Sequence, residues 1–298
     1  MEQKAYSWRS LSNEALPKAE TMSKGVTANP ASPDFARFKQ AIYKKTGIDL
    51  SLYKSQQMHR RLYNMVERAG LRTFDEYFAL IEQEEQEFFA FLDRMTINVS
   101  ELFRNPEKWE ELTHSVLPEL LKTRSNLKVW SAGCSYGAEP YTLLLLLSQM
   151  TKYGRHTLHA TDIDKKILAK AQEGLFTEAD VKNVPPKLLE EYFHTLSQPN
   201  SHLNPTLPKY QIKPGLRAKI GFRQQNLLAD RFENDYDLIC CRNVVIYFTD
   251  EAKERLYEQF VKSLRVGGYL LVGGTERIVG YQNLGLDNPI PFFYRRVR

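Results

Sequence analysis

The chain has 298 residues, enough for one large or two modest domains, and its 42% hydrophobic and 26% charged residues are typical of a soluble protein. Even the leucine run Leu143 to Leu147 is far too short to span a bilayer, and the polar N-terminus has no secretory hydrophobic region, so we expect a cytoplasmic protein. The net charge is a modest +5, and the three cysteines lack metal-ligand spacing, so we expect reduced cysteines and no metal site.

Residues 1 to about 33 are rich in Ser, Lys, Pro and Ala without apolar periodicity, and we expect a flexible tail there. Helical spacing of apolar residues then predicts a small all-α domain over residues 34–95. Thr73 and Glu76 have the spacing of a capping box at the start of one helix. The expected helices begin at Asp34, about Leu52, Thr73 and about Glu84.

The second expected helix is basic. Lys54, Arg61 and Arg68 recur every seven residues, which places them in a line beside the apolar face. Residues 73–93, by contrast, hold seven acidic residues and no Lys or Arg. Two solvated helix faces would explain this pattern, and a surface for an acidic partner is the other interpretation.

The segment TINVSELFRNP, residues 96–106, breaks the helical pattern and predicts a linker over residues 96–108 that forms a hinge or a site wall. Strands and helices alternate from Leu127 onward, so we expect an α/β domain over residues 109–298. Tyr210 to Lys213 followed by Ala218 to Phe222 predicts a short hairpin, and with it a small β insertion at about residues 195–222.

The most informative stretch is LKVWSAGCSYGAEPYT, residues 127–142, which predicts a buried strand, a glycine-containing turn and an acidic residue opening a helix. Gly133 and Gly137 allow the backbone to turn sharply beside a ligand. Glu139, and Asp162 at the end of the next strand, stand where such folds bind ribose hydroxyl groups. The turn lacks the glycine pattern for pyrophosphate, which favours S-adenosylmethionine, although glycine turns follow strands in any α/β protein.

Two later strand ends carry asparagine, in Asn226-Leu227 and Asn243-Val244. Ligands of open α/β sheets bind beyond the carboxyl ends of the strands, so these residues belong to the same candidate site. An Asn side chain both donates and accepts hydrogen bonds, which suits an adenine edge or an amino-acid group. An ordinary turn role would also explain either asparagine.

Five segments, in this order, resemble the chemotaxis receptor glutamate O-methyltransferases, in particular the Bacillus-type members: TINVSELFRNP, WSAGCSYGAEPYT, ATDIDKKILAKA, QNLLADRF and DLICCRNVVIYF. The resemblance covers about residues 34–298. It implies a class I (Rossmann-like) S-adenosylmethionine-dependent methyltransferase domain with a small inserted β subdomain, preceded by a small all-α domain. It also implies methyl transfer to receptor glutamates in bacterial sensory adaptation, with S-adenosylhomocysteine as product.

The resemblance implies that three linker residues close over the cofactor and that two acids take its amino-acid and ribose ends. The implied cofactor-binding residues are Asn98, Ser100, Arg104, Gly133, Glu139, Asp162, Asn226, Leu227, Asn243 and Val244. Two positions depart from the family pattern. Ala138 stands where the family usually has Glu, and Leu102 where it usually has an aromatic residue.

The implied reaction needs no general base, because a glutamate side chain is ionised at pH 7 and a sulfonium is a reactive methyl donor. Arg104 and Tyr247 are the candidate catalytic residues, since a guanidinium and a phenol can both orient a carboxylate. A half-buried strand-end tyrosine is the other interpretation of Tyr247. The resemblance also implies a face that docks the receptor's glutamate-rich helices, formed by Lys54, Arg60, Arg61 and Arg68.

Two other functions remain open. Nucleic-acid and protein amide N-methyltransferases resemble one another in an Asn/Asp-Pro-Pro-aromatic turn, where this chain has Arg242 to Val245. A signalling adaptor that binds S-adenosylmethionine without catalysis would need neither Arg104 nor Tyr247. We expect methyl-accepting chemotaxis receptors as partners, a monomer, no membrane insertion, and no nucleic acid, because the basic helix lacks interleaved stacking aromatics.

Overall fold

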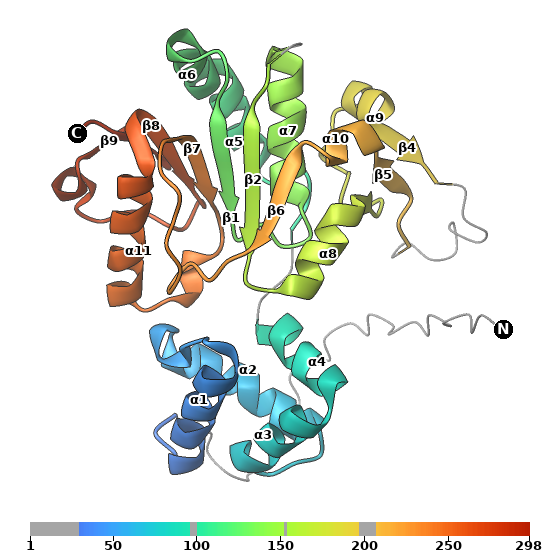
Figure 1. Ribbon diagram of the computed structural model, residues 1–298, viewed down its shortest axis with the longest axis vertical. Coiled ribbons are helices and arrows are strands. Elements are labelled where there is room, and N and C mark those ends of the chain that lie inside the picture. Colours follow the sequence, from blue (N-terminus) through green and yellow to red (C-terminus); the bar gives the residue numbers. More distant parts are fainter. Residues whose placement is uncertain (1–29, 96–99, 152–153, 197–206) are drawn as a thin grey trace.

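The computed structural model describes residues 30–95, 100–151, 154–196 and 207–298, which form a small helical domain packed against a larger α/β domain (Figure 1). Most of the tail expected at residues 1–33 therefore lies outside the described residues. No helix in the described ranges has both the length and the apolar character needed to cross a membrane.

The small domain contains α1 (Pro33–Thr46), the short turn η1 (Leu50–Leu52), α2 (Ser55–Arg68), α3 (Phe74–Gln83) and α4 (Glu85–Met95). Helix α1 ends at Gly47, whose φ of 72° is left-handed and whose N–H donates to the Tyr43 carbonyl oxygen at 2.8 Å. Helix α3 begins with the predicted capping box between Thr73 and Glu76. The core of this domain is rich in buried aromatic rings, among them Phe35, Phe38, Phe74, Tyr77 and Phe91.

The larger domain is built on a seven-stranded sheet with the order β6-β2-β1-β7-β8-β10-β9. Five neighbouring strands are parallel: β6 (Ile220–Gln224), β2 (Thr157–Asp162), β1 (Lys128–Ala132), β7 (Tyr236–Cys241) and β8 (Leu264–Val272). The strand β10 (Phe293–Arg296) pairs antiparallel with β8 and with the edge strand β9 (Leu286–Ile290). Because β2 and β7 lie on opposite sides of β1, the order in which the chain adds strands to the sheet reverses at β1. Open sheets bind ligands where the strand order reverses in this way.

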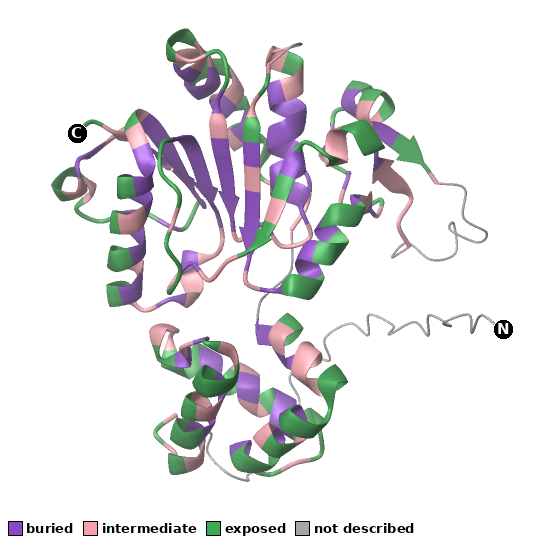
Figure 2. Cartoon of the chain, in the orientation of Figure 1, coloured by how far each residue is buried: buried purple, intermediate pink, exposed green. Residues whose placement is uncertain are grey.

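Helices cover both faces of this sheet, so its central strands β1 and β7 are buried while the outer helix faces are exposed (Figure 2). One hydrophobic cluster joins the sheet to α5 (Pro106–Glu111), the π-helical turn η2 (Leu112–Val116), α6 (Leu117–Thr123), α7 (Ala138–Met150) and α8 (Lys165–Glu173). The other joins it to α11 (Asp250–Ser263) and to residues near η3 (Val245–Tyr247) and η4 (Tyr281–Leu284). Adjacent Cys240 and Cys241 belong to different clusters, as residues on opposite strand faces should.

A second, three-stranded sheet lies beside the main one, and the pairing of its strands shows that the predicted hairpin is wrong. It has the order β3-β5-β4, formed by β3 (Leu175–Phe176), β5 (Tyr210–Ile212) and β4 (Phe193–Thr195), with α9 (Pro186–Tyr192) between β3 and β4. The predicted partner at Ala218 to Phe222 instead contributes to β6, which pairs in parallel with β2. The short helix α10 (Pro214–Arg217) separates β5 from β6, because the proline ends the strand and begins a new turn.

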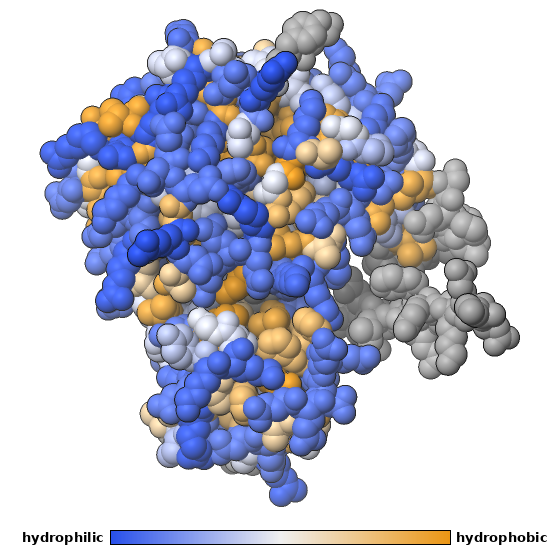
Figure 3. Space-filling view, in the orientation of Figure 1, coloured by the Kyte–Doolittle hydropathy of each residue, from blue (hydrophilic) through white to orange (hydrophobic). Residues whose placement is uncertain are grey.

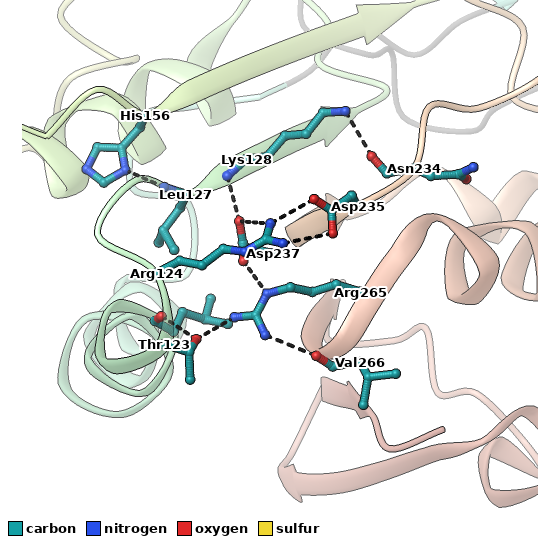
Figure 4. A network of polar contacts seen from close by, with 11 residues as sticks. Thr123, Arg124, Leu127, Lys128, His156, Asn234, Asp235, Asp237, Arg265 and Val266 are labelled. Carbon is teal, nitrogen blue, oxygen red and sulfur yellow. Dashed lines mark hydrogen bonds and ion pairs between the residues drawn. The ribbon is translucent and has the colours of Figure 1, made fainter.

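A buried carboxylate joins the amino ends of the central strands, at the end of the sheet opposite the pocket side (Figure 4). Asp237 is fully buried, accepts a hydrogen bond from the Lys128 N–H at 2.7 Å and forms an ion pair with Arg265. Arg124 lies 3.7 Å from the same carboxylate. Asp237 thus connects β1, β7 and β8 at one end, leaving the other end for a site.

The face of the molecule seen in Figure 3 is largely hydrophilic, with hydrophobic side chains gathered near the level at which the two domains meet. Part of this junction is a pair of backbone hydrogen bonds. The Lys54 N–H donates to the Tyr247 carbonyl oxygen and the Thr249 N–H donates to the Leu52 carbonyl oxygen, each at 2.9 Å. The helical domain is therefore bonded directly to the segment that follows β7.

Candidate functional site

The carboxyl ends of β1, β2 and β7 open into a pocket of about 1010 Å³, its mouth included. The candidate catalytic residue Tyr247 lines it, whereas Asn98 lies outside the described residues. The other residues expected to bind the cofactor all line this pocket: Ser100, Arg104, Gly133, Glu139, Asp162, Asn226, Leu227, Asn243 and Val244. The fold thus brings together residues spread over about half of the sequence, and their individual roles stay predictions.

The turn after β1 brings the backbone to the pocket wall. Gly133 has a φ of 79°, and a Cβ placed there would lie 2.5 Å from a methyl group of Val244. Gly133 is therefore required both by its left-handed backbone and by the close approach of a neighbouring loop. The N–H groups of Gly133 and Cys134 donate to the Thr161 carbonyl oxygen at 2.8 and 2.9 Å, which ties the turn to β2.

Asp162 is a buried acid at the end of β2. Its carboxylate accepts hydrogen bonds from the N–H groups of Ser135 at 2.8 Å and Asp164 at 3.1 Å. Burial raises the pKa of Asp162 to about 6, although these donors favour the ionised form. A carboxylate held in this way is suited to accept hydrogen bonds from further donors, such as ribose hydroxyl groups.

Glu139 lies in the first turn of α7 and is partly buried. It accepts a hydrogen bond from the Ser131 hydroxyl at 2.8 Å, and an Arg242 guanidinium nitrogen lies 3.9 Å from its other oxygen. Burial raises the pKa of Glu139, and the charge of Arg242 opposes that rise. The preceding residue, Ala138, is fully buried in the core, so this departure from the family pattern leaves Glu139 in the pocket wall.

The described part of the linker is tied to the larger domain through its backbone. The Leu102 N–H donates to the Asp180 carbonyl oxygen at 2.9 Å, and the Phe103 N–H donates to the Thr142 hydroxyl at 3.0 Å. Leu102 is fully buried, so the residue that replaces the family's aromatic packs into the core. Phe103 has a φ of 53°, a left-handed conformation that non-glycine residues rarely adopt and that clusters at functional sites.

Arg242, at the end of β7, is a pocket residue that the sequence analysis did not single out. Its guanidinium donates to the Arg104 carbonyl oxygen at 2.9 Å and to the Asn105 side chain at 3.0 Å, and it stacks 4.9 Å above the Trp109 ring. Arg242 therefore connects the strand end to the linker. The sequence signal that could have identified Arg242 is its place directly after an apolar strand.

Tyr53, from the helical domain, is a second pocket residue that the sequence analysis missed. Its ring packs edge-on against Phe248, with the ring centroids 5.2 Å apart. No local motif marks this residue, because its place in the pocket depends on how the two domains pack.

The predicted basic face does not point uniformly outward. Arg60 and Arg68 are exposed, whereas Lys54 and Arg61 are partly buried. Arg61 donates to the Met95 carbonyl oxygen at 2.8 Å, and its guanidinium lies 5.4 Å from the centre of the Tyr247 ring. The line of cations expected on α2 is thus divided between an outward surface and an inward contact.

Comparison with known proteins places the chain among methyltransferases. The family profile described as CheR methyltransferase, SAM binding domain, matches residues 98–286, and that of the CheR methyltransferase, all-alpha domain, matches residues 33–96. The chain is 37% identical to the chemotaxis protein methyltransferase of Listeria monocytogenes over 262 residues, which are 88% of this chain and 96% of the relative. It is 32% identical to that of Escherichia coli over 249 residues, covering 81% of this chain and 83% of the relative.

Proposed function

The chain belongs to the CheR family of chemotaxis protein methyltransferases, with S-adenosylmethionine as cofactor, and from this premise we propose its substrate. It methylates glutamate side-chain carboxylates in the cytoplasmic helical domain of methyl-accepting chemotaxis receptors, giving glutamate methyl esters and S-adenosylhomocysteine. The observation that carries this proposal is one pocket that combines two acids, the buried Asp162 and the partly buried Glu139, with the cationic Arg104 and the phenolic Tyr247.

The residues of the pocket fit the chemical groups of this cofactor. The buried Asp162 carboxylate can accept hydrogen bonds from ribose hydroxyl groups, and the acidic Glu139 suits an ammonium group. Gly133 leaves the backbone of the first turn without a Cβ, next to Val244. We propose that Ser100 and Arg104 close the pocket from the linker side.

The chain's own residues have to orient the substrate rather than activate it. S-adenosylmethionine supplies a methyl group already activated by its sulfonium, and a glutamate carboxylate is ionised at neutral pH. Arg104 orients that carboxylate through charge-assisted hydrogen bonds, and the Tyr247 hydroxyl donates to the same group. Burial raises the pKa of Tyr247, which keeps the hydroxyl protonated as a donor at neutral pH. Strong pairing would stabilise the ground state, so orientation is the useful effect.

The outward part of the basic face is proposed to dock the receptor. Arg60 and Arg68 are exposed on α2, and a glutamate-rich receptor helix offers the complementary charge. Such an encounter is accelerated at low ionic strength and screened by salt. Helix α2 begins beside Tyr53 and Lys54, which contact the pocket segment, so a helix docked there lies near the pocket.

The experiment that tests the proposal is incubation of the purified protein with methyl-labelled S-adenosylmethionine and receptor-containing membranes, followed by mild alkali. We expect label on the receptor that alkali releases, because carboxyl esters hydrolyse where N-methyl groups persist. Label that survives alkali would replace the proposal with N-methylation. Cofactor binding without any receptor label would leave a non-catalytic adaptor or another substrate.

A further inference from the structure

Glu276 has a buried carboxylate that accepts a backbone hydrogen bond from the loop after β7. Only 4% of the residue is exposed, and its Oε2 accepts hydrogen bonds from the N–H groups of Asn243 and Gly273, each at 2.7 Å. Backbone groups of Val244 and Ile246 also stabilise the charged carboxylate. One side chain therefore spans the loop from the pocket-lining Asn243 to the turn that carries Tyr247.

Asn243 carries the sharp turn of this loop. Its φ of 61° is left-handed, a region that few residues with side chains occupy and that Asn tolerates better than most. Such a conformation persists where the surrounding structure determines it strongly, and it often marks a functional site. The bond to Glu276 is made by the N–H of this same residue.

Two glycines leave the loop little room to move. A Cβ on Gly273 would collide with the Glu276 carboxylate, and a Cβ on Gly133 would lie 2.5 Å from a Val244 methyl group. The loop is thus held between the first turn of the pocket and the carboxylate. A shift toward either side would move Asn243 and Val244, which both line the pocket.

The hydrogen bonds of Glu276 serve this loop and its own turn. Its Oε2 makes the two bonds described above, while its Oε1 has no hydrogen-bond partner among the described residues. Its N–H donates to the Gly273 carbonyl oxygen at 2.9 Å, which closes the turn after β8. The side chain therefore joins the loop after β7 to the turn after β8.

We infer that Glu276 is a positioning residue for the cofactor site: it fixes Asn243 and Val244 against the bound cofactor and sets the orientation of Tyr247. The inference rests on the proposed function for the identity of the site. It adds a group that does not line the pocket and that holds Asn243 through the backbone of the loop.

The test compares Glu276→Ala and Glu276→Gln with a matched control, Asp237→Ala. Asp237 is also a buried carboxylate that accepts a backbone N–H, but it lies at the opposite end of β7. The affinity for S-adenosylmethionine is measured by calorimetry, kcat and KM by receptor methylation, and the midpoint by thermal unfolding, all at a temperature at which each variant is folded.

We expect Glu276→Ala to weaken cofactor affinity at least tenfold and to lower kcat as well, because Tyr247 shifts with the loop. The glutamine variant keeps an acceptor and should bind within about threefold of the wild type. Asp237→Ala should lose thermal stability yet bind within twofold. Wild-type affinity in Glu276→Ala, or equal losses in the alanine and glutamine variants, would overturn the inference.

Gly273→Ala provides a second route that keeps the carboxylate in the chain. Its added Cβ would push Glu276 away, so we expect the same loss of cofactor affinity. Unchanged affinity in this folded variant would also count against the inference. Cofactor binding is read without a receptor, so a wild-type protein that binds cofactor but does not label receptors would refute the proposed function alone.

Discussion

Burial in the pocket wall disfavours the ionised form of individual carboxylates. Burial raises the pKa of Asp162 to about 6, well above the value of 3.8 for a free aspartate side chain. The Asp162 carboxyl of the folded state therefore holds an extra proton between these two pH values. The contribution of Asp162 to stability is greatest at the acidic side of this window, falls as the pH rises through it, and stays reduced above pH 6. A ligand that donates to the carboxylate would offset this cost.

Asp162→Asn should remove the free-energy cost of burying an ionised carboxylate and should also weaken cofactor binding. At pH 7.5 we expect the cofactor-free variant to be more stable by at most about 2 kcal/mol, because an amide has no ionised form to bury, while its NH2 group faces one of the two N–H donors that the carboxylate accepts and offsets part of the gain. The difference should shrink toward pH 4, while cofactor affinity falls at least tenfold. Denaturant unfolding across this range, with calorimetry of cofactor binding, makes the measurement. A variant with the same pH dependence as the wild type would contradict the assignment of that dependence to Asp162.

Arg104→Ala should abolish methyl transfer without unfolding the protein. The bonds from Trp109 and Arg242 reach the Arg104 carbonyl oxygen, so they survive removal of the side chain. We expect kcat to fall at least about 100-fold through loss of orientation, with a thermal midpoint within a few degrees of the wild type. Turnover near that of the wild type would remove Arg104 from the proposed mechanism.

At the scale of elements, the sequence predicts what depends on local rules. The capping box at Thr73 and the glycine end of α1 need only short-range signals, and both are found. The acids after β1 and β2 were predictable because parallel strands present their carboxyl ends at one edge. The contribution of residues 220–224 to the main sheet was not, because pairing with β2 competes with a local hairpin and only tertiary packing decides between them.

Helix α2 also shows that residue spacing alone does not predict which side chains of a helix are exposed. Its seven-residue repeat places Arg61 in line with Arg68, yet Arg61 bonds inward to Met95 because α4 ends beside it. Docking contacts are therefore better sought at the exposed Arg60 and Arg68.

Reversing both exposed charges, in Arg60→Glu with Arg68→Glu, should lower kcat/KM for receptor methylation about tenfold at low salt. The deficit should shrink as salt screens the attraction that the wild type uses. Cofactor affinity should not change. Lys122→Glu with Lys262→Glu, at exposed positions on α6 and α11, makes the same change in net charge and serves as the control. Receptor kinetics equal to those of the control would argue against this docking face.

At the scale of the whole molecule, the two domains share one site. Tyr53 comes from the helical domain and lines the pocket, and the flanking backbone of Leu52 and Lys54 bonds to the segment that carries Tyr247. The N–H of Lys54, the residue that caps the start of α2, therefore donates to the carbonyl oxygen of the candidate catalytic residue Tyr247. Sequence patterns within either domain could not reveal this, because the contact depends on packing between segments far apart in the chain.

Tyr53→Ala should consequently affect both stability and cofactor binding. It removes a pocket wall and an edge-on ring contact with Phe248, and such a pair contributes about 1 kcal/mol beyond its buried area. We expect a lower thermal midpoint and cofactor affinity weakened about tenfold, whereas Tyr53→Phe keeps the ring and should bind within threefold of the wild type. Calorimetry on both variants separates the outcomes. If Tyr53→Ala lost stability but bound cofactor normally, the helical domain would act as a support for the pocket segment rather than as part of the site; a joint loss would make the two domains one binding unit.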